Sequence, residues 1–223
     1  MAYIDFMSSL HRATKRDYLA RVNDPEFPKA KAARLAKRWG VDYWDGDRRI
    51  NYGGYKYIPG RWTPLAQQLI EHYKLKPGDC VLDIGCGKGF LLFELKQLIP
   101  ELQIFGLDIS SYAIENSKEE VRDSLHIGSA ASLPYAASSM DLVLSINTLH
   151  NLRCYDLEKA LHEISRVMKE KAYICVESYR NEEEKANLLY WQVTCESFYA
   201  TEEWQWWMLK TNYFGDYSFI YFG

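Results

Sequence analysis

Three glycines at alternate positions follow a short apolar run and an aspartate in the stretch CVLDIGCGKGF, residues 80–90. Glycines where a strand ends and a helix begins let bare backbone approach a ligand closely, at the carboxyl edge of a parallel sheet. The stretch therefore predicts a loop that holds a small molecule between a strand and the helix that follows it.

Two common kinds of glycine-rich loop require residues that this stretch lacks. A phosphate-binding loop has the pattern G-x-x-x-x-G-K-[ST]. Lys88 does follow Gly87, but the spacing of the glycines does not fit, and Gly89 stands in place of the hydroxyl residue. A dinucleotide-binding loop has the pattern G-x-G-x-x-G, and its last glycine, counted from Gly85, is replaced by the bulky Phe90. A nicotinamide oxidoreductase is therefore disfavoured.

A third kind of loop fits, because the chain closely resembles class I S-adenosylmethionine-dependent methyltransferases. Their first motif runs hydrophobic, hydrophobic, Asp or Glu, hydrophobic, G-x-G-x-G, and VLDIGCGKG (81–89) matches every specified position. The resemblance covers roughly residues 57–222. It extends to IGSAASLPYAASSMDLVLSINTLHNL (127–152), which is similar to the third and fourth motifs but carries Ser129 where the family commonly has aspartate. The cofactor implied is S-adenosylmethionine.

The resemblance also implies which residues hold that cofactor. Asp83 is expected to organise the loop amides or to meet the ligand's ammonium, and Asp108 to accept hydrogen bonds from the ribose hydroxyls. Ile109 would lie against the adenine, whose amino group would meet the Ser129 hydroxyl or the Ala130 amide. The positions expected at the cofactor are Asp83, Gly85, Cys86, Gly87, Gly89, Asp108, Ile109, Ser129, Ala130 and Asn147.

Two residues are candidates for the chemistry itself. Methyl transfer is a displacement at an activated sulfonium carbon, so the protein must align the acceptor, exclude water and take up a proton where needed. His150, after the expected fourth strand, is similar in placement to a histidine of small-molecule methyltransferases; it acts as a base or only shapes the pocket. Tyr57 is similarly placed to a tyrosine-bearing loop of phosphoethanolamine N-methyltransferases, and is otherwise part of a packed connector.

Cations and aromatic residues gather in two further stretches. Arg48, Arg49 and Arg61 are candidates for binding an anionic acceptor, because guanidinium groups make bidentate contacts with oxyanions. The alternative is a solvated surface paired with Asp42, Asp45 and Asp47. Seven aromatic residues between positions 190 and 207 form either a cation-binding or sugar-stacking platform or the packing of the last helix.

The elements that must position these residues alternate along the chain. Strands are expected at 80–85, 103–109, 125–130, 140–147, 171–178 and 216–222. Helices are expected at 29–38, 88–98, 111–121, 155–169, 182–192 and 201–210, and one more begins at Thr63 and is ended by KPGD (76–79). The predicted fold is α/β and Rossmann-like: a mostly parallel sheet with an antiparallel C-terminal strand and helices on both faces. Residues 1–62 are expected to form a helical and loop lid over a core domain at 63–223.

Composition excludes several classes of protein. The net charge of -3 and pI of about 6.0 lack the basic footprint of a nucleic-acid-binding protein. Five scattered cysteines without a C-x-x-C pair predict reduced thiols in the cytoplasm and no metal site. No stretch approaches the roughly 18 apolar residues of a membrane span, and the N-terminus has no export signal.

The sequence therefore predicts a monomeric or homodimeric enzyme that transfers a methyl group from S-adenosylmethionine to an O or N atom of a small polar acceptor, such as a sugar, a phosphorylated amine or a small acid. An RNA or protein methyltransferase is the first alternative; the basic helix at 29–38 is its support, and the N-P-P-Y-type tetrapeptide is absent. The second is a non-catalytic subunit that binds the cofactor.

Overall fold

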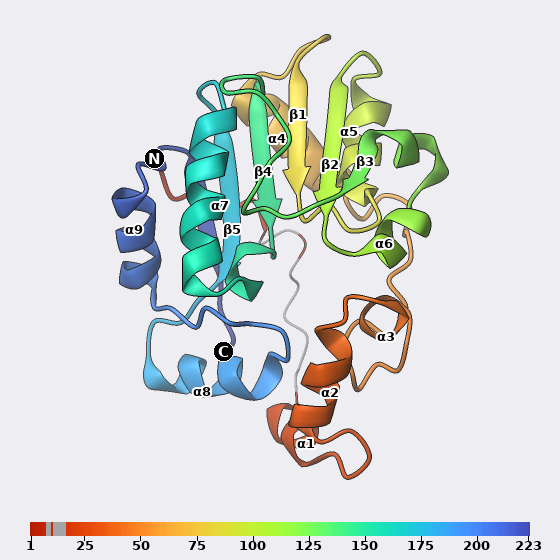
Figure 1. The fold of residues 1–223 in the computed structure, drawn as a ribbon, viewed down its shortest axis with the longest axis vertical. Helices are drawn as coiled ribbons and strands as arrows, with labels where there is room; N and C mark the ends of the chain where they lie inside the picture. Colours follow the sequence, from red (N-terminus) through yellow and green to blue (C-terminus); the bar gives the residue numbers. More distant parts are fainter. Residues whose placement is uncertain (8–9, 11–16) are drawn as a thin grey trace.

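A six-stranded sheet forms the centre of the computed structural model, which describes residues 1–7, 10 and 17–223 (Figure 1). The strand order is β3-β2-β1-β4-β5-β6 and every neighbouring pair is parallel. The strands are β1 (Cys80–Ile84), β2 (Gln103–Asp108), β3 (Leu125–Ile127), β4 (Leu142–Ile146), β5 (Ala172–Glu177) and β6 (Asp216–Ile220). The order reverses beside β1, so ligands are expected at the carboxyl ends of β1 and β4.

The expected antiparallel C-terminal strand is wrong. β6 runs parallel to β5, with Tyr173 opposite Asp216 and Glu177 opposite Ile220. The physical reason is the long connection at 178–215, which contains α8 (Glu182–Trp191) and α9 (Thr201–Lys210). A connection of this length returns the chain to the opposite end of the sheet, as a parallel crossover requires.

Helices cover both faces of the sheet. α4 (Thr63–Tyr73) and α5 (Phe90–Leu98) pack on one face, where their leucines meet strand residues such as Val81 and Leu144. α7 (Cys154–Val167) and α9 pack on the other face against Leu82 and Val143. Successive strand residues point to opposite faces, so the continuous apolar runs of these strands fill two cores.

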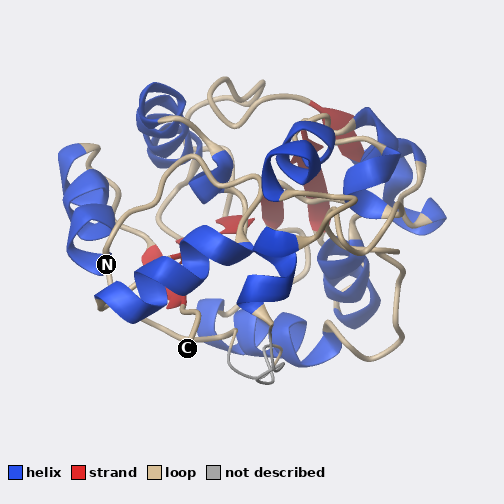
Figure 2. Cartoon of the chain, turned by 90° about the horizontal axis from the view of Figure 1, so that it is seen from below, coloured by secondary structure: helices blue, strands red, loops and turns tan. Residues whose placement is uncertain are grey.

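The remaining elements surround the carboxyl edge of the strands, which Figure 2 shows from below. α1 (Tyr18–Asn23) packs against α8, and α2 (Lys29–Ala36) against α3 (Val41–Trp44). A small separate core holds Tyr43, Trp44 and Ile50 of this N-terminal part. α6 (Ser111–Glu115) follows β2, and short 3-10 turns span Glu119–Ser124 and Leu149–Asn151.

The first residues lie apart from the rest of the N-terminal part. Tyr3 forms a parallel bridge with Tyr217 of β6, and Phe6 and Met7 are buried in the core with α4. Within the described residues, no helix is long and apolar enough to cross a bilayer.

Candidate functional site

The glycine-rich loop lies between β1 and α5 with its three glycines in the left-handed backbone region. Gly85 has φ +80, and a Cβ there would lie 1.9 Å from the hydroxyl oxygen of Thr148. At Gly87, with φ +54, a Cβ would lie 2.8 Å from the Trp44 ring. Both positions require glycine for two reasons: the backbone is left-handed, and a neighbouring side chain occupies the space of a Cβ atom. The loop is thereby held between the end of β4 and the N-terminal part.

Two buried carboxylates stand beside this loop and differ in their partners. Asp108 accepts hydrogen bonds from the Gly87 amide at Oδ2 and the Ser110 amide at Oδ1, each 2.8 Å long. Asp83 has no such bond among the described residues. Burial and then the charge of Asp108 raise the pKa of Asp83 to about 7. Asp108, and not Asp83, therefore organises a loop amide.

A cavity of about 210 Å³ opens at this loop, and we call it the motif cavity. The ends of three strands line it, through Asp83, Asp108 and Asn147 among others. Every residue expected at the cofactor lines it except Gly89, which packs toward Val121 and Leu125 instead. The lining residues from the expected set are Asp83, Gly85, Cys86, Gly87, Asp108, Ile109, Ser129, Ala130 and Asn147.

Residues 39–62 form one wall of the motif cavity. The Trp44 indole N–H donates to the Ser110 hydroxyl at 2.9 Å, and Lys88, which is 5% exposed, pairs with Asp45 at 2.6 Å. Tyr55 stacks on Phe90, with ring centroids 5.1 Å apart. Lys88 and Phe90, which flank the last glycine of the motif, thus anchor the N-terminal part on the loop.

A second and larger cavity, of about 850 Å³, adjoins the first, and we call it the outer cavity. Tyr43, Tyr52 and Asn147 line both cavities. Other walls come from α1, α8, the end of β5, residues 48–61 and the turn after β4. Among the lining residues are Arg21, Arg48, Arg61, His150, Glu177 and Trp191. A molecule in the outer cavity would therefore meet one in the motif cavity at Asn147.

His150 and Glu177 form a buried pair in the outer cavity. The imidazole is 2% exposed, and burial lowers its pKa to about 3, so the ring is neutral at pH 7. Its Nδ1 accepts the Glu177 amide hydrogen at 3.4 Å, which leaves the proton on Nε2, 3.5 Å from the Glu177 carboxylate. The Gln192 amide also donates to this carboxylate. Both ring nitrogens of His150 are thus directed at Glu177.

Tyr57 lies away from both cavities. Its hydroxyl donates to the Glu94 carboxylate, which raises the Tyr57 pKa to about 12, and its ring meets the edges of Phe90 and Phe93. The tyrosines that the fold does bring to the cavities are Tyr43, Tyr52 and Tyr55, from the same aromatic segment. Sequence spacing did not distinguish among them, because the path of the segment depends on where α3 docks.

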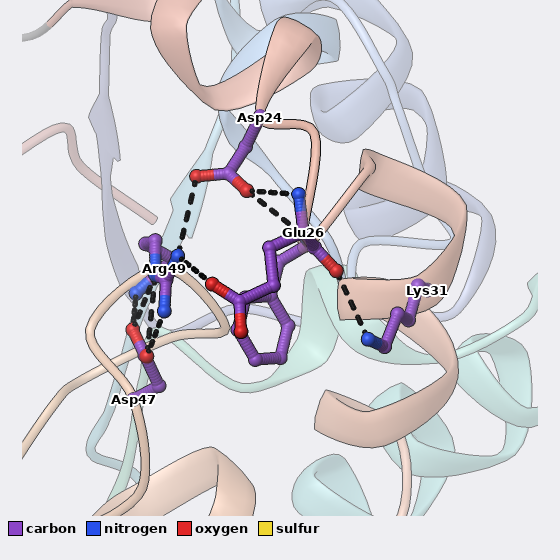
Figure 3. A network of polar contacts seen from close by, with 6 residues as sticks. Asp24, Glu26, Lys31, Asp47 and Arg49 are labelled. Atoms are coloured by element: carbon purple, nitrogen blue, oxygen red, sulfur yellow. Dashed lines mark hydrogen bonds and ion pairs between the residues drawn. The ribbon is translucent and has the colours of Figure 1, made fainter.

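Arg49 also lies outside both cavities. Its guanidinium pairs with Asp47 and Glu26, both at 2.6 Å, and approaches Asp24 at 3.9 Å (Figure 3). The alternative interpretation, a surface cation paired with neighbouring acids, holds for this residue. Arg48 and Arg61 do line the outer cavity.

Sequence analysis missed Glu177 and Arg21. Glu177 ends β5, the fifth strand, in ICVES, and an acid closing a buried strand was the available signal. Arg21 lies in a short helix whose sequence, YLARVN, has no feature that points to a ligand. Among the described residues no cluster of His, Cys, Asp and Glu has the arrangement of a metal site.

Known proteins match this chain over its central part. A family model described as a methyltransferase domain matches residues 75–213. A demethylmenaquinone methyltransferase of Symbiobacterium thermophilum is 30% identical over 128 residues, which make up 53% of this chain and 50% of that protein. The chain spans about half the length of the curated relatives that it matches first.

Two further matches broaden the comparison. The tRNA (carboxymethyluridine(34)-5-O)-methyltransferase of Arabidopsis thaliana is 31% identical over 145 residues, covering 65% of this chain and 34% of that one. The solved structure of Haemonchus contortus phosphoethanolamine N-methyltransferase 2 with S-adenosyl-L-methionine superposes with a TM-score of 0.53 at 16% identity, covering 88% of this chain and 44% of that chain. At 16% identity, this superposition shows a shared fold.

Proposed function

Because the chain belongs to the class I methyltransferase family, we propose that it transfers a methyl group from S-adenosylmethionine to an O or N atom of a small polar acceptor. The observation that carries this proposal is the pair of cavities that meet at Asn147, one at the glycine loop and one lined by polar and charged groups. Two adjoining compartments suit a cofactor and an acceptor that must react in line.

The motif cavity fits S-adenosylmethionine in the chemistry of its lining. The side-chain oxygens of Asn147 and Asn151 are buried there without a hydrogen-bond partner among the described residues, so they are available to ligand N–H or O–H groups. Asp83 would face the ammonium group, Asp108 the ribose hydroxyls, and Ile109, which is 56% exposed, the adenine. The cofactor supplies a methyl group on a positively charged sulfur, a leaving group that needs little assistance.

Residues 1–62 contribute the lid in this proposal, through residues 39–62. Trp44 and Asp45 hold that segment against the loop, where it would cover bound cofactor and exclude water. The core domain at 63–223 supplies the cofactor residues. Tyr57 and Arg49 are left out of the proposed acceptor site, whereas Arg48 and Arg61 remain in it.

Glu177 is the group that we assign to proton uptake, with His150 as the residue that positions it. As the acceptor oxygen or nitrogen bonds to the methyl carbon, the carbon–sulfur bond breaks and S-adenosylhomocysteine leaves. The acceptor's proton then passes to the Glu177 carboxylate, which lines the outer cavity. The neutral His150 ring accepts the Glu177 backbone amide at Nδ1 and lies with Nε2 3.5 Å from the carboxylate, which restricts where that carboxylate can move.

The size of the outer cavity supports a small-molecule acceptor rather than a nucleic acid. All of its lining residues come from one chain, so the proposed enzyme is a monomer or a homodimer. The outer cavity is bounded by α1, α8 and the lid, and the two named relatives act on different acceptors, a quinone precursor and a tRNA nucleoside. The acceptor of this chain is therefore assigned from its own cavity.

Calorimetric titration with S-adenosylmethionine and, in parallel, with NADH tests the proposal. We expect micromolar binding of the former alone, and a loss of about 1–3 kcal/mol in Asp108→Ala because polar groups of the ligand would lose their partner. Binding of NADH alone would overturn the proposed function. Unchanged affinity in Asp108→Ala would remove the ribose assignment and leave the family intact.

A further inference from the structure

Two arginines that line the outer cavity face the same indole ring. The guanidinium carbon of Arg21 lies 4.9 Å from the centroid of the Trp191 ring, and that of Arg48 lies 6.0 Å from it. Arg21 donates to the Ile50 carbonyl at 2.7 Å and Arg48 donates to the Asn51 carbonyl. Backbone carbonyls and one ring therefore hold two positive charges close together.

Neither charge is neutralised by a carboxylate. Among the described residues, no Asp or Glu forms an ion pair with Arg21 or Arg48 within 4.0 Å, and the Nε of Arg21 is buried without a hydrogen-bond partner. Burial and then the charge of Arg48 lower the pKa of Arg21 to about 10. The Arg21 guanidinium is therefore charged at pH 7, and an anion bound between it and Arg48 would offset their repulsion.

The acidic groups of the outer cavity contact residues other than Arg21 and Arg48. Asp17 caps α1 by accepting the Ala20 amide hydrogen at 2.9 Å. Glu177 accepts a hydrogen bond from Gln192 and lies 3.5 Å from Nε2 of His150. The outer cavity thus holds a bound carboxylate, Glu177, and two arginines over Trp191 that no carboxylate of the described residues pairs with.

We propose that the Arg21 and Arg48 guanidinium groups bind an oxyanion of the methyl acceptor, a carboxylate or a phosphate. This inference rests on the proposed function in so far as the outer cavity holds the acceptor. The acceptor extends from its reacting O or N atom at Glu177 to its anionic group over Trp191. Guanidinium groups suit either oxyanion, because they donate parallel hydrogen bonds to paired oxygens.

Side-chain NMR of the full chain, labelled with 15N-arginine, tests the anion site directly. The Nε–H signals of Arg21 and Arg48 are assigned by their disappearance in Arg21→Gln and Arg48→Gln, and are followed during titration with sodium phosphate, sodium acetate or sodium chloride at matched ionic strength. We expect saturable shifts with millimolar midpoints in phosphate, acetate or both. Phosphate alone would identify a phosphate group, and acetate alone a carboxylate.

Variants separate the site from general charge effects. Arg48→Gln should weaken anion binding at least about tenfold, through lost charge-assisted hydrogen bonds. Arg48 is exposed, so this variant should fold even if Arg21→Gln does not. The matched control is Arg49→Gln, next in sequence but paired with Asp47 and Glu26 on the surface, which should bind the anion unchanged. Non-saturating shifts equal in phosphate, acetate and chloride would overturn the inference.

Calorimetry of the same samples distinguishes the two proposals. S-adenosylmethionine binding without saturable anion binding would refute the anion site alone. Saturable anion binding without S-adenosylmethionine binding would refute the proposed function and, with it, the identification of the anion as part of a methyl acceptor.

Discussion

At the scale of single residues, Asp83 and Asp108 show how two acids at one sheet edge acquire different properties. Asp108 receives backbone amides from Gly87 and Ser110, and these bonds oppose the effect of burial on its pKa. Asp83 is buried beside that charge without comparable bonds among the described residues, and its pKa rises to about 7. Asp83 is therefore the acid that gains most from a cationic ligand.

The raised pKa of Asp83 predicts pH-dependent cofactor affinity. Below about pH 7 the carboxyl group binds a proton that a ligand ammonium must displace, so affinity for S-adenosylmethionine should fall by up to about tenfold per pH unit. Calorimetry from pH 5.5 to 8.5 measures this slope. Asp83→Asn should flatten it, and the exposed Asp123→Asn should not. An equal slope in Asp83→Asn would contradict the assignment.

The raised pKa of Asp83 affects folding in the opposite direction: low pH weakens cofactor binding but stabilises the folded protein. In the unfolded chain Asp83 ionises near pH 4, whereas in the folded protein it keeps its proton until about pH 7. Its contribution to the free energy of unfolding is therefore fully present below pH 4 and is lost as the pH rises through 7.

Glu177 carries a prediction about turnover. Once an acceptor is known, Glu177→Gln should lower kcat by about 10²–10⁴, the usual contribution of a general base, while leaving cofactor affinity unchanged. Glu196→Gln, which removes the charge of a surface residue paired with Lys37, is the control.

Because His150 stays neutral, its replacement by Gln should slow turnover without removing a limb of the pH profile near 6.5. Loss of such a limb would make His150 the base.

At the scale of elements, the lid segment is attached to the glycine loop by one partly buried ion pair and several rings. Lys88 has a side chain only 6% exposed, and that of Asp45 is 24% exposed. The Tyr112 hydroxyl and the Tyr55 amide also donate to Asp45. The lid and the cofactor loop should therefore lose stability together.

Lys88→Met tests this coupling. It leaves Asp45 without its cation, and we expect the free energy of unfolding to fall by about 1–3 kcal/mol, with weaker cofactor binding. Urea unfolding of the wild type, Lys88→Met, Asp45→Asn and the double variant gives the coupling energy. Lys159→Met, from an exposed pair with Asp156, should change stability by under about 1 kcal/mol. Additive losses would show that the pair does not couple lid and loop.

At the scale of the whole molecule, the two ends of the chain join one edge of the sheet. The Ile4 amide donates to the Tyr217 carbonyl at 2.9 Å, and Phe6 packs edge-on against Tyr173 with centroids 5.0 Å apart. The edge strand β6 is thus covered on its open side by residues that precede the lid.

Phe6→Ala should accordingly destabilise the whole fold. Loss of a buried phenylalanine costs about 3–5 kcal/mol, and we expect the melting temperature to fall while the remaining folded protein binds S-adenosylmethionine with unchanged affinity. Tyr3→Ala removes a side chain that is 49% exposed and should cost much less. Weakened cofactor binding in Phe6→Ala at temperatures where it is folded would contradict this separation of edge and site.

The sequence by itself determined the parallel βα core and the residues at the glycine loop, because each depends on neighbours close in the chain. Apolar periodicity located the strands and helices, and the glycine pattern itself located Gly85 and Gly87, whose left-handed backbone favours glycine. Nine of the ten residues expected at the cofactor line one cavity, because parallel strands bring their carboxyl ends to the same edge of the sheet.

Only the tertiary structure decided the direction of β6, the choice among the tyrosines and the identity of the cavity arginines. Strand direction depends on hydrogen bonds between β5 and β6, which the intervening residues 178–215 separate in sequence. Arg48 and Arg49 are adjacent in the chain, yet one enters the outer cavity and the other pairs with Glu26. Arg21 joins Arg48 because α1 packs on α8, a contact between distant segments that no local pattern encodes.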